Sequence, residues 1–171
     1  MFKWRSRYFF HRTMYWTTYY DSRRRGSITR AGLDGSNRTE IVEGLQSPGG
    51  IVIDHSSSML FWTDHFANCI QSSDLDGGNI RTVATLQGRT TPWGIALYGD
   101  KLFWGNYHTM TLQSANKSGG SDQTVYRTDT NPTHLVLVTK AVPKISRRND
   151  CDGQSCGKIC VLTPTSFRCV D

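Results

Sequence analysis

This chain of 171 residues lacks long hydrophobic runs and helical periodicity. Its longest purely aliphatic run is Leu135 to Val138, whereas a membrane-spanning helix needs about 20 apolar residues. No window keeps an apolar period of about 3.6 residues, which argues against amphipathic helices. Residues 1–13 have neither an apolar core nor a small-residue cleavage site, so they are not a signal peptide. The sequence therefore predicts no helix and no membrane span.

Motifs for catalysis and metal binding are also scarce. The chain has no Gly-x-Ser-x-Gly sequence, no phosphate-binding glycine loop and no close histidine pair at metal-ligand spacing. Aspartates fall in predicted strands and turns rather than in a ligand-spaced loop. We therefore expect no enzyme activity, no catalytic residue, no cofactor and no metal. A zinc site at Cys151, Cys156 and Cys160 is the alternative in a reducing compartment.

The net charge of +6 comes from the N-terminal part of the chain. Residues 1–30 hold eight Lys or Arg against one acid, whereas residues 31–171 hold twelve against thirteen. The basic part includes the run Arg23, Arg24, Arg25. Such a run is most simply a solvated hairpin tip, and contact with an acidic protein or a sulfated glycan is the alternative. Nothing resembles a nucleic-acid-binding fold, and we expect no nucleic-acid partner.

Tryptophan occurs in one short motif that recurs along the chain. Trp16, Trp62 and Trp104 are 46 and 42 residues apart. Their segments, called here the Trp motifs, are Met14–Thr18, Leu60–Asp64 and Leu102–Asn106. A turn motif keeps the same step, at 31–38, 73–79 and, in degenerate form, 114–120. A Pro motif closes each unit, at 47–51, 91–95 and 131–135. Three signals in the same order, three times over, indicate structural repeats.

Each unit is predicted to contain four short β-strands. Runs of β-branched and aromatic residues alternate with Asp-Gly, Gly-Gly and Pro-Gly turns, which is typical of strands joined by tight hairpins. The expected innermost strands are 50–54, 94–97 and 135–138, and the outermost are 39–42, 80–84 and 123–126. Between them lie the Trp-motif strand and the strand before the turn motif. Four short antiparallel strands per repeat predict the blades of a β-propeller in an all-β protein.

The Trp motif, the Leu-Asp-Gly-Ser-Asn-Arg turn at 33–38 and the Pro-Trp-Gly-Ile sequence at 92–95 resemble the YWTD repeats of low-density lipoprotein receptor-related proteins. The resemblance implies a six-bladed propeller, of which this chain holds about three four-stranded blades. Their approximate bounds are 14–54, 55–97 and 98–145, after a non-repeat basic segment at 1–13. It also implies that the chain is one stretch of a larger extracellular protein.

The C-terminal cysteines resemble the first four of an EGF-like module, which commonly follows the last blade in this family. Cys151, Cys156, Cys160 and Cys169 are separated by four, three and eight residues. The resemblance implies a partial module at 146–171 with the disulfides Cys151–Cys160 and Cys156–Cys169, in an oxidising extracellular setting. Cys69 is left over, and we expect it to be a buried free thiol.

The resemblance also assigns structural roles within the Trp motifs. The residues expected to build the blades are Tyr15, Trp16, Phe61, Trp62, Asp64, Phe103 and Trp104. Family blades usually end this motif with an aspartate whose carboxylate accepts backbone hydrogen bonds between blades. Only Asp64 matches, because Thr18 and Asn106 stand at the other two positions. Neither brings an anionic acceptor, so we expect weaker cohesion around the first and third units.

Partners of this family dock on one face of the propeller, on loops that follow the Trp motif or lead into the next inner strand. By resemblance those loops are 19–26, 65–68, 107–109, 47–49, 89–93 and 131–133. Trp93 is the leading candidate contact, because aromatic side chains are typical binding hot spots; packing in the core is the alternative. Further candidates, for which an ordinary exposed position is the simpler interpretation, are Arg89, His65, Tyr107, Arg23, Arg24 and Arg25.

The function implied by the resemblance is non-catalytic recognition by a cell-surface receptor or co-receptor. The expected partners are extracellular proteins, namely Wnt-pathway ligands, lipoproteins or matrix proteins. A basement-membrane linker of the nidogen type, or a pro-EGF-like precursor, is the alternative, and a stand-alone basic intracellular protein is the third. Membrane attachment is expected only through other parts of a parent chain. Three isolated blades are expected to dimerise or aggregate through their uncovered flanks.

Two sequons for N-glycosylation are intact. They are Asn37-Arg38-Thr39 and Asn116-Lys117-Ser118, whereas Asn131-Pro132-Thr133 is excluded by its proline. Both intact sequons coincide with the predicted turn after the third strand of a unit, where a glycan is tolerated. Asn37 and Asn116 are therefore candidate glycosylation sites.

Overall fold

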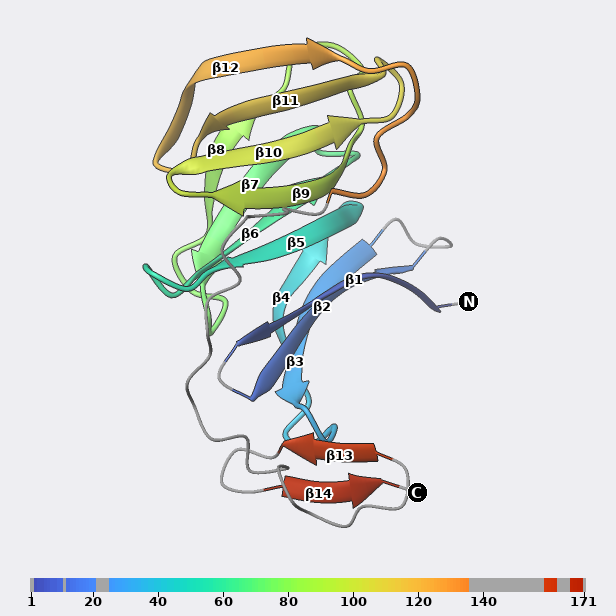
Figure 1. The fold of residues 1–171 in the computed structure, drawn as a ribbon, viewed down its shortest axis with the longest axis vertical. Coiled ribbons are helices and arrows are strands. Elements are labelled where there is room, and N and C mark those ends of the chain that lie inside the picture. The colour runs from blue at the N-terminus through green and yellow to red at the C-terminus, as the bar shows by residue number, and fades with distance from the viewer. Residues whose placement is uncertain (1, 11, 21–24, 136–158, 163–166, 171) are drawn as a thin grey trace.

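The computed structural model describes residues 2–10, 12–20, 25–135, 159–162 and 167–170 (Figure 1). All regular structure in these ranges is β-strand, arranged as three four-stranded antiparallel sheets and one two-stranded hairpin. Within these ranges there is no helix of the length and apolarity needed to cross a membrane. The prediction of an all-β fold is confirmed.

The three large sheets follow one another along the chain and stack one beside the next (Figure 1). The first contains β1 (Phe2–Phe10), β2 (Thr13–Tyr20), β3 (Arg25–Gly32) and β4 (Thr39–Leu45). The second contains β5 (Pro48–Asp54), β6 (Met59–Asp64), β7 (Cys69–Asp74) and β8 (Arg81–Thr85). The third contains β9 (Pro92–Tyr98), β10 (Lys101–Asn106), β11 (Thr111–Asn116) and β12 (Gly119–Arg127). The C-terminal hairpin is β13 (Ile159–Leu162) and β14 (Phe167–Val170).

Sequence repeats and structural sheets are offset by one strand. The first sequence unit, 14–54, ends in β5, but β5 pairs with β6 of the second sheet, where Val52 lies opposite Phe61. In the same way β9 closes the second sequence unit and pairs with β10 of the third sheet. Each of these sheets therefore takes its first strand from the preceding repeat, which joins successive repeats through backbone hydrogen bonds.

The basic segment at 1–13, set apart from the repeats on sequence grounds, contributes a strand to the first sheet. β1 pairs antiparallel with β2, with Phe2 opposite Tyr20 and Phe10 opposite Thr13. The sequence gives no sign of this pairing, because a ladder is made by backbone N–H and C=O groups that almost every residue carries. In the other two sheets the corresponding strand, β5 or β9, begins within a Pro motif. β1 therefore completes the first sheet although it carries no Pro motif.

Two buried apolar clusters fill the spaces between neighbouring sheets. One joins the first and second sheets through Tyr15, Ile28, Val42, Leu45, Ile51, Ile53, Leu60 and Trp62. The other joins the second and third sheets through Val52, Phe61, Ile70, Val83, Ala84, Leu86, Ile95, Leu102, Trp104 and Ala115. Strand β5 contributes to both, because alternate side chains of a strand point to opposite faces. The second sheet is consequently buried on both sides, and β5 is buried along its whole length.

The tryptophans of all three Trp motifs are buried, and Trp62 and Trp104 belong to the two clusters. Trp16, Trp62 and Trp104 are at most 2% exposed, and truncating a buried tryptophan to alanine typically costs about 3–5 kcal/mol. Phe61 is buried between the second and third sheets, but its counterpart Phe103 is only half-buried. The difference follows from position, because Phe103 alternates with the residues that face the second sheet and the described residues place no further sheet on its own side.

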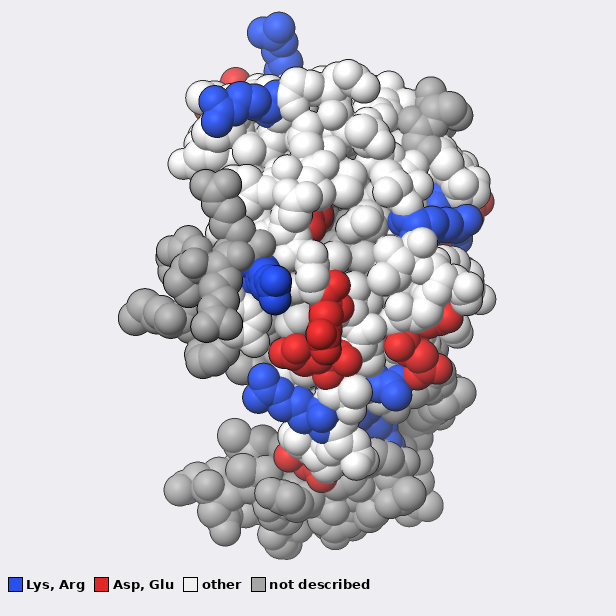
Figure 2. Space-filling view, turned by 180° about the vertical axis from the view of Figure 1, so that it is seen from behind, with Lys and Arg blue, Asp and Glu red and all other residues white. Residues whose placement is uncertain are grey.

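Charged side chains are spread over the face drawn in Figure 2, where acids gather near the middle and Lys and Arg lie around them. This arrangement agrees with the near balance of charge within residues 31–171. The described Lys and Arg side chains therefore form no continuous basic patch on this face.

Candidate ligand-docking face

Turns that follow the Trp motifs lie against the Pro motifs at one end of the sheets. In the second sheet the backbone N–H of His65 donates to the carbonyl of Ser47 at 3.0 Å. In the third sheet the N–H of Tyr107 donates to the carbonyl of Thr91 at 3.2 Å. The two kinds of loop that the sequence assigns to a docking face therefore adjoin each other.

A hollow of about 200 Å³ opens at this end, between the second and third sheets. We call it the docking pocket; its lining residues are His65, Phe66, Asn68, Gly88, Arg89, Thr91 and His108. They come from the β6–β7 turn, the β8–β9 connection and the β10–β11 turn. The structure thus brings together two of the candidate contacts, His65 and Arg89, which are 24 positions apart in the sequence.

Aromatic rings border the docking pocket. The imidazole of His65 stacks on Phe66 with ring centroids 4.9 Å apart, and it lies 5.1 Å from the indole of Trp93. Phe66 continues toward Tyr19 of the first sheet, at 6.5 Å. Phe66 is 49% exposed, whereas Trp93 is half-buried. Trp93 is therefore absent from the buried core clusters, and its ring supports the histidine that lines the pocket.

Asn68 fixes one wall of the pocket. Its side-chain amide donates to the carbonyls of Leu86 at 2.9 Å and Gly88 at 2.6 Å, and its Oδ1 accepts from the hydroxyl of Thr90 at 2.6 Å. Asn68 also has a positive φ of 52°, a conformation that asparagine tolerates better than most residues. The amide therefore holds the connection that carries Arg89 in a single conformation.

Thr91 occupies a strained position in the pocket wall. Its φ is 51°, and a β-branched residue is a genuine outlier in this region. Such strain costs on the order of 1–3 kcal/mol and concentrates at functional sites. The hydroxyl of Thr91 accepts from the backbone N–H of His108 at 3.2 Å. The strained residue thus positions the β10–β11 turn on the far side of the pocket.

The remaining candidate contacts fall in different places. Tyr107 is 45% exposed, and its ring packs edge-on against His108 at 5.6 Å, beside the pocket. Arg25 begins β3 and lies in a separate hollow with Glu40 and Glu43. Arg23 and Arg24 lie outside the described residues. The sequence analysis identified the loops but did not single out the lining residues Phe66, Asn68, Thr91 and His108. Their positions just after a Trp motif or within a Pro motif could have identified them.

Polar residues at the ends of the Trp motifs determine how the second sheet is attached to its neighbours. The carboxylate of Asp64 accepts backbone N–H groups from Gln46 at 2.9 Å, Ser47 at 3.0 Å and Ala67 at 3.1 Å. At the matching position in the third sheet, Asn106 donates to the hydroxyl of Thr111 at 3.1 Å. The Oδ1 of Asn106 is buried and has no hydrogen-bond partner among the described residues.

Threonine hydroxyls next to these positions link successive sheets. Thr17 donates to the carbonyl of Gly49 at 2.7 Å, and Thr63 donates to the carbonyl of Trp93 at 2.6 Å. The third copy has Gly105 instead, and a Cβ there would overlap the carbonyl of Pro132. The missing side chain lets the third Pro motif approach directly, so the contact is kept by backbone packing rather than by a hydroxyl.

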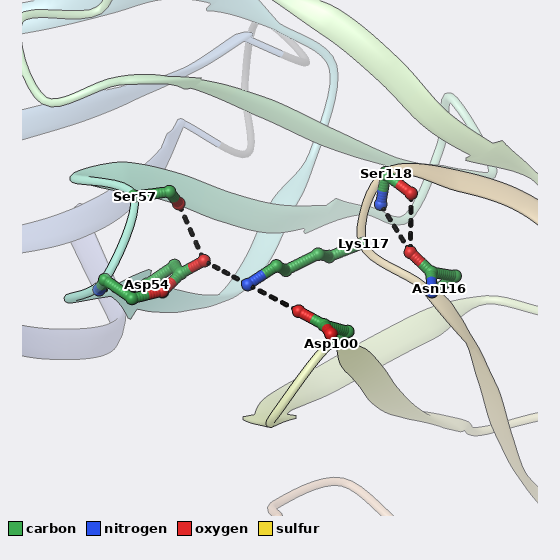
Figure 3. A network of polar contacts seen from close by, with 7 residues as sticks. Asp54, Ser57, Asp100, Asn116, Lys117 and Ser118 are labelled. Carbon is green, nitrogen blue, oxygen red and sulfur yellow. Dashed lines mark hydrogen bonds and ion pairs between the residues drawn. The ribbon is translucent and has the colours of Figure 1, made fainter.

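An ion network centred on the buried Asp54 joins the second and third sheets (Figure 3). Lys117, in the β11–β12 turn, reaches Asp54 at 2.8 Å and Asp100 at 3.0 Å. Asp54 also accepts hydrogen bonds from Ser56 and Ser57. Burial by itself raises the pKa of Asp54, but these hydrogen bonds outweigh it and hold the pKa well below its usual range. The same contacts raise the pKa of Lys117.

The cysteines and the sequons complete the candidate residues. Cys69 is a buried free thiol, as expected, and burial raises its pKa to about 11. Cys160 and Cys169 lie opposite each other across the β13–β14 hairpin. Cys151 and Cys156 lie outside the described residues, so the predicted disulfides stay predictions. Within the described ranges no three His, Cys, Asp or Glu side chains are arranged to hold a metal ion.

Comparison with known proteins gives this arrangement a family. The profile of the low-density lipoprotein receptor repeat class B matches residues 12–55, which almost coincide with the first sequence unit. Residues 12–55 are a class B repeat of the low-density lipoprotein receptor type. The chain is 31% identical to low-density lipoprotein receptor-related protein 5 of Mus musculus, over 83% of this chain and 9% of that protein. It is 28% identical to the vitellogenin receptor of Solenopsis invicta, over 84% of this chain and 8% of that protein.

Solved structures give the same fold. A chain of a nidogen/laminin complex superposes with a TM-score of 0.67 and 26% identity, over 77% of this chain and 51% of that one. Structures at 11% and 16% identity, enzymes among them, share the fold alone. The chain spans less than a tenth of each curated relative and about half of the nidogen-complex chain that it matches.

Proposed function

We propose that this chain is a non-catalytic recognition module of an extracellular or cell-surface receptor, and that protein ligands bind at the docking pocket and its aromatic border. The similarity to two proteins named as receptors supports the receptor class. We expect the ligands to be secreted proteins, namely Wnt-pathway ligands, lipoproteins or matrix proteins. Anchoring to a membrane would come from other parts of a longer protein.

The observation that carries this proposal is the placement of exposed aromatic side chains around the pocket. Phe66 is 49% exposed and Tyr107 is 45% exposed. Both lie on short turns that are fixed by strands and by hydrogen bonds to the Pro motifs. Rigid aromatic side chains that flank a concave site are the residues that contribute most to binding at protein interfaces.

Direct binding tests the proposal. The full chain is immobilised and presented with purified laminin, vitellogenin, low-density lipoprotein and a Wnt-pathway ligand. A bound ligand should lose about tenfold in affinity on Tyr107→Ala, since central aromatic contacts are worth more than 1 kcal/mol. Tyr98→Ala is the matched control, because Tyr98 is 60% exposed at the opposite end of the third sheet.

Two outcomes would contradict the proposal. One is the absence of binding to every ligand in this set. The other is an equal loss for Tyr98→Ala and Tyr107→Ala, which would move the interface away from the docking pocket.

A matrix linker is the second candidate function, and the nidogen/laminin structure favours it. The nidogen-complex chain is 26% identical to the present chain, and the match covers 77% of the present chain. Binding to laminin without binding to the soluble ligands would support a matrix linker. The reverse result would support the receptor.

A further inference from the structure

We propose that the docking pocket binds a carboxylate side chain, Asp or Glu, from an extended segment of the protein ligand, and that Arg89 is its principal partner. This inference rests on the proposed function, because it names the chemistry that the same site recognises. It goes further in that it assigns the polar contact that sets specificity, whereas the aromatic border supplies apolar contact area.

The positive charge of Arg89 favours an anionic group on the ligand. Arg89 is exposed, and it makes no hydrogen bond or ion pair with any residue that the structure describes. The imidazoles of His65 and His108 line the same hollow, and none of its described lining residues is Asp or Glu. A guanidinium presents donors in a planar fork that matches a carboxylate, and such charge-assisted pairs are stronger than neutral ones.

Asp64, the carboxylate next to the lining residue His65 in the sequence, does not compensate this charge. It is 1% exposed and its oxygens accept three backbone N–H groups. Its hydrogen bonds are therefore directed into the protein rather than toward the pocket. The guanidinium of Arg89 remains available to an acid supplied by a partner.

Size and rigidity restrict what the pocket accepts. A hollow of about 200 Å³ has room for one side chain rather than for a folded element. Its walls are fixed by the three hydrogen bonds of Asn68 and by the strained Thr91, which bonds the turn that carries His108. A site that is formed before binding loses less entropy on association. Asn68 is therefore a positioning residue, which acts on the ligand through the connection that presents Arg89.

Selection from a random peptide library tests the inference directly. The full chain is used as bait, and the sequences that it retains are compared with those retained by Arg89→Gln and Arg89→Glu. The wild-type chain should enrich Asp or Glu at one peptide position, and acidic peptides should bind Arg89→Gln about tenfold more weakly. Arg89→Glu should reverse the preference and enrich Lys or Arg. Arg81→Gln is the matched control, because Arg81 is exposed and begins β8, before the connection that carries Arg89.

A further variant separates positioning from folding. Asn68→Gly removes the three hydrogen bonds but tolerates the positive φ of 52°. It should reduce the preference for acidic over neutral peptides by about threefold to fivefold, a fraction of the Arg89 effect, since Arg89 is present but less well placed.

The inference is overturned if no acidic residue is enriched, or if the enrichment survives both Arg89 variants. Retention of laminin or another extracellular ligand would still uphold the proposed function in that case. Enrichment of acidic peptides that depends on Arg89, without binding to any of those ligands, would support the pocket chemistry and contradict the proposed function instead.

Discussion

The second and third copies of the Trp motif have the same apolar positions and different polar ends. Leu60 and Trp62 in β6, and Leu102 and Trp104 in β10, all have a relative exposure of 0%. After the tryptophan, however, the second copy continues with Thr-Asp and the third with Gly-Asn. In both sheets the apolar residues pack against the preceding sheet. The polar ends decide how each sheet holds the neighbouring Pro-motif segments.

The consequence is that the polar end of the second copy makes more hydrogen bonds than that of the third. Asp64 accepts three backbone N–H groups, and Thr63 links β6 to the Pro motif of the third sheet. Among the described residues the buried Oδ1 of Asn106 has no hydrogen-bond partner, and Gly105 offers no hydroxyl. Apolar burial is tolerant of the exact polar context, whereas a buried carboxylate needs donors in fixed places. The comparison predicts that the same substitution has unequal effects in the two copies.

The largest effect is expected for Asp64→Ala. It would leave three backbone N–H groups without their acceptor, and we expect a loss of about 3 kcal/mol in the free energy of unfolding. Asn106→Ala removes one hydrogen bond and an unpartnered oxygen, so we expect a loss of only about 1 kcal/mol. Urea denaturation of the full chain measures both. Equal losses would show that the two polar ends contribute alike and would refute the comparison.

Lys117→Met is expected to come next, because it leaves Asp54 buried without its cation. We expect a loss of about 2–3 kcal/mol at neutral pH, at or below the lower end of the range for a fully buried pair, because the Lys117 side chain is 19% exposed. The control is Asp100→Asn, whose side chain is 76% exposed and whose replacement should change stability little. Urea midpoints report both values, and an equal loss for the control would contradict a special role for Asp54.

The pH dependence of this network follows from the lowered pKa of Asp54. A carboxyl group whose pKa is lower in the folded state stabilises the fold above its unfolded pKa, near 4, and this contribution fades as the pH falls toward the folded pKa. The wild-type chain should therefore lose stability below about pH 4, and Lys117→Met should lose less over the same interval. Urea midpoints between pH 7 and pH 3 would test this, and parallel curves for the two proteins would contradict it.

Gly105→Ala tests how the third copy of the Trp motif contacts the third Pro motif. A Cβ would overlap the carbonyl of Pro132, and we expect a cost of about 2 kcal/mol for the displaced segment. Gly119→Ala is the control, because its Cβ would meet nothing within 4 Å. Thermal unfolding of both variants measures the difference. Stability that is unchanged by Gly105→Ala would mean that the third Pro motif does not rest on this glycine.

The smallest effect concerns glycosylation and compares the first turn motif with the third. Asn37 is exposed, with a φ of 52°. Asn116 is half-buried, and its Oδ1 accepts the N–H and the hydroxyl of Ser118 at 2.9 and 2.6 Å. We expect a glycan at Asn37 and none at Asn116. Mass spectrometry before and after enzymatic deglycosylation, on secreted Asn37→Gln and Asn116→Gln variants, would show this; a mass change caused by Asn116→Gln would contradict it.

Much of the fold could be predicted because its signals are local. Tryptophan spacing, β-branched runs and glycine turns predict three four-stranded units, and the structure contains three such sheets. The strand β1 was beyond reach, because residues 2–10 copy none of the three motifs. The pairing of Lys117 with Asp54 was equally hidden, since the two residues are 63 positions apart and only the packing of adjacent sheets joins them.

The candidate site was predicted in outline only. The loops that contain His65, Arg89, Trp93 and Tyr107 were identified by resemblance, and the structure places these residues in or beside one pocket. The same reasoning also named Arg25, which lies in a different hollow. Arg25 also follows a Trp motif, but it borders a hollow shared with Glu40 and Glu43 of β4, and that neighbourhood depends on strand packing rather than on the motif.

The sequence by itself determined the all-β class, the repeat and the alternation of buried residues, because these depend on periodicity and turn chemistry within a few residues. Tertiary structure decided the rest. The offset of sheets by one strand, the completion of the first sheet by β1 and the meeting of three loops around Arg89 all depend on how neighbouring sheets pack. Contacts between distant segments depend on the burial of many side chains together, and a short sequence motif does not contain that information.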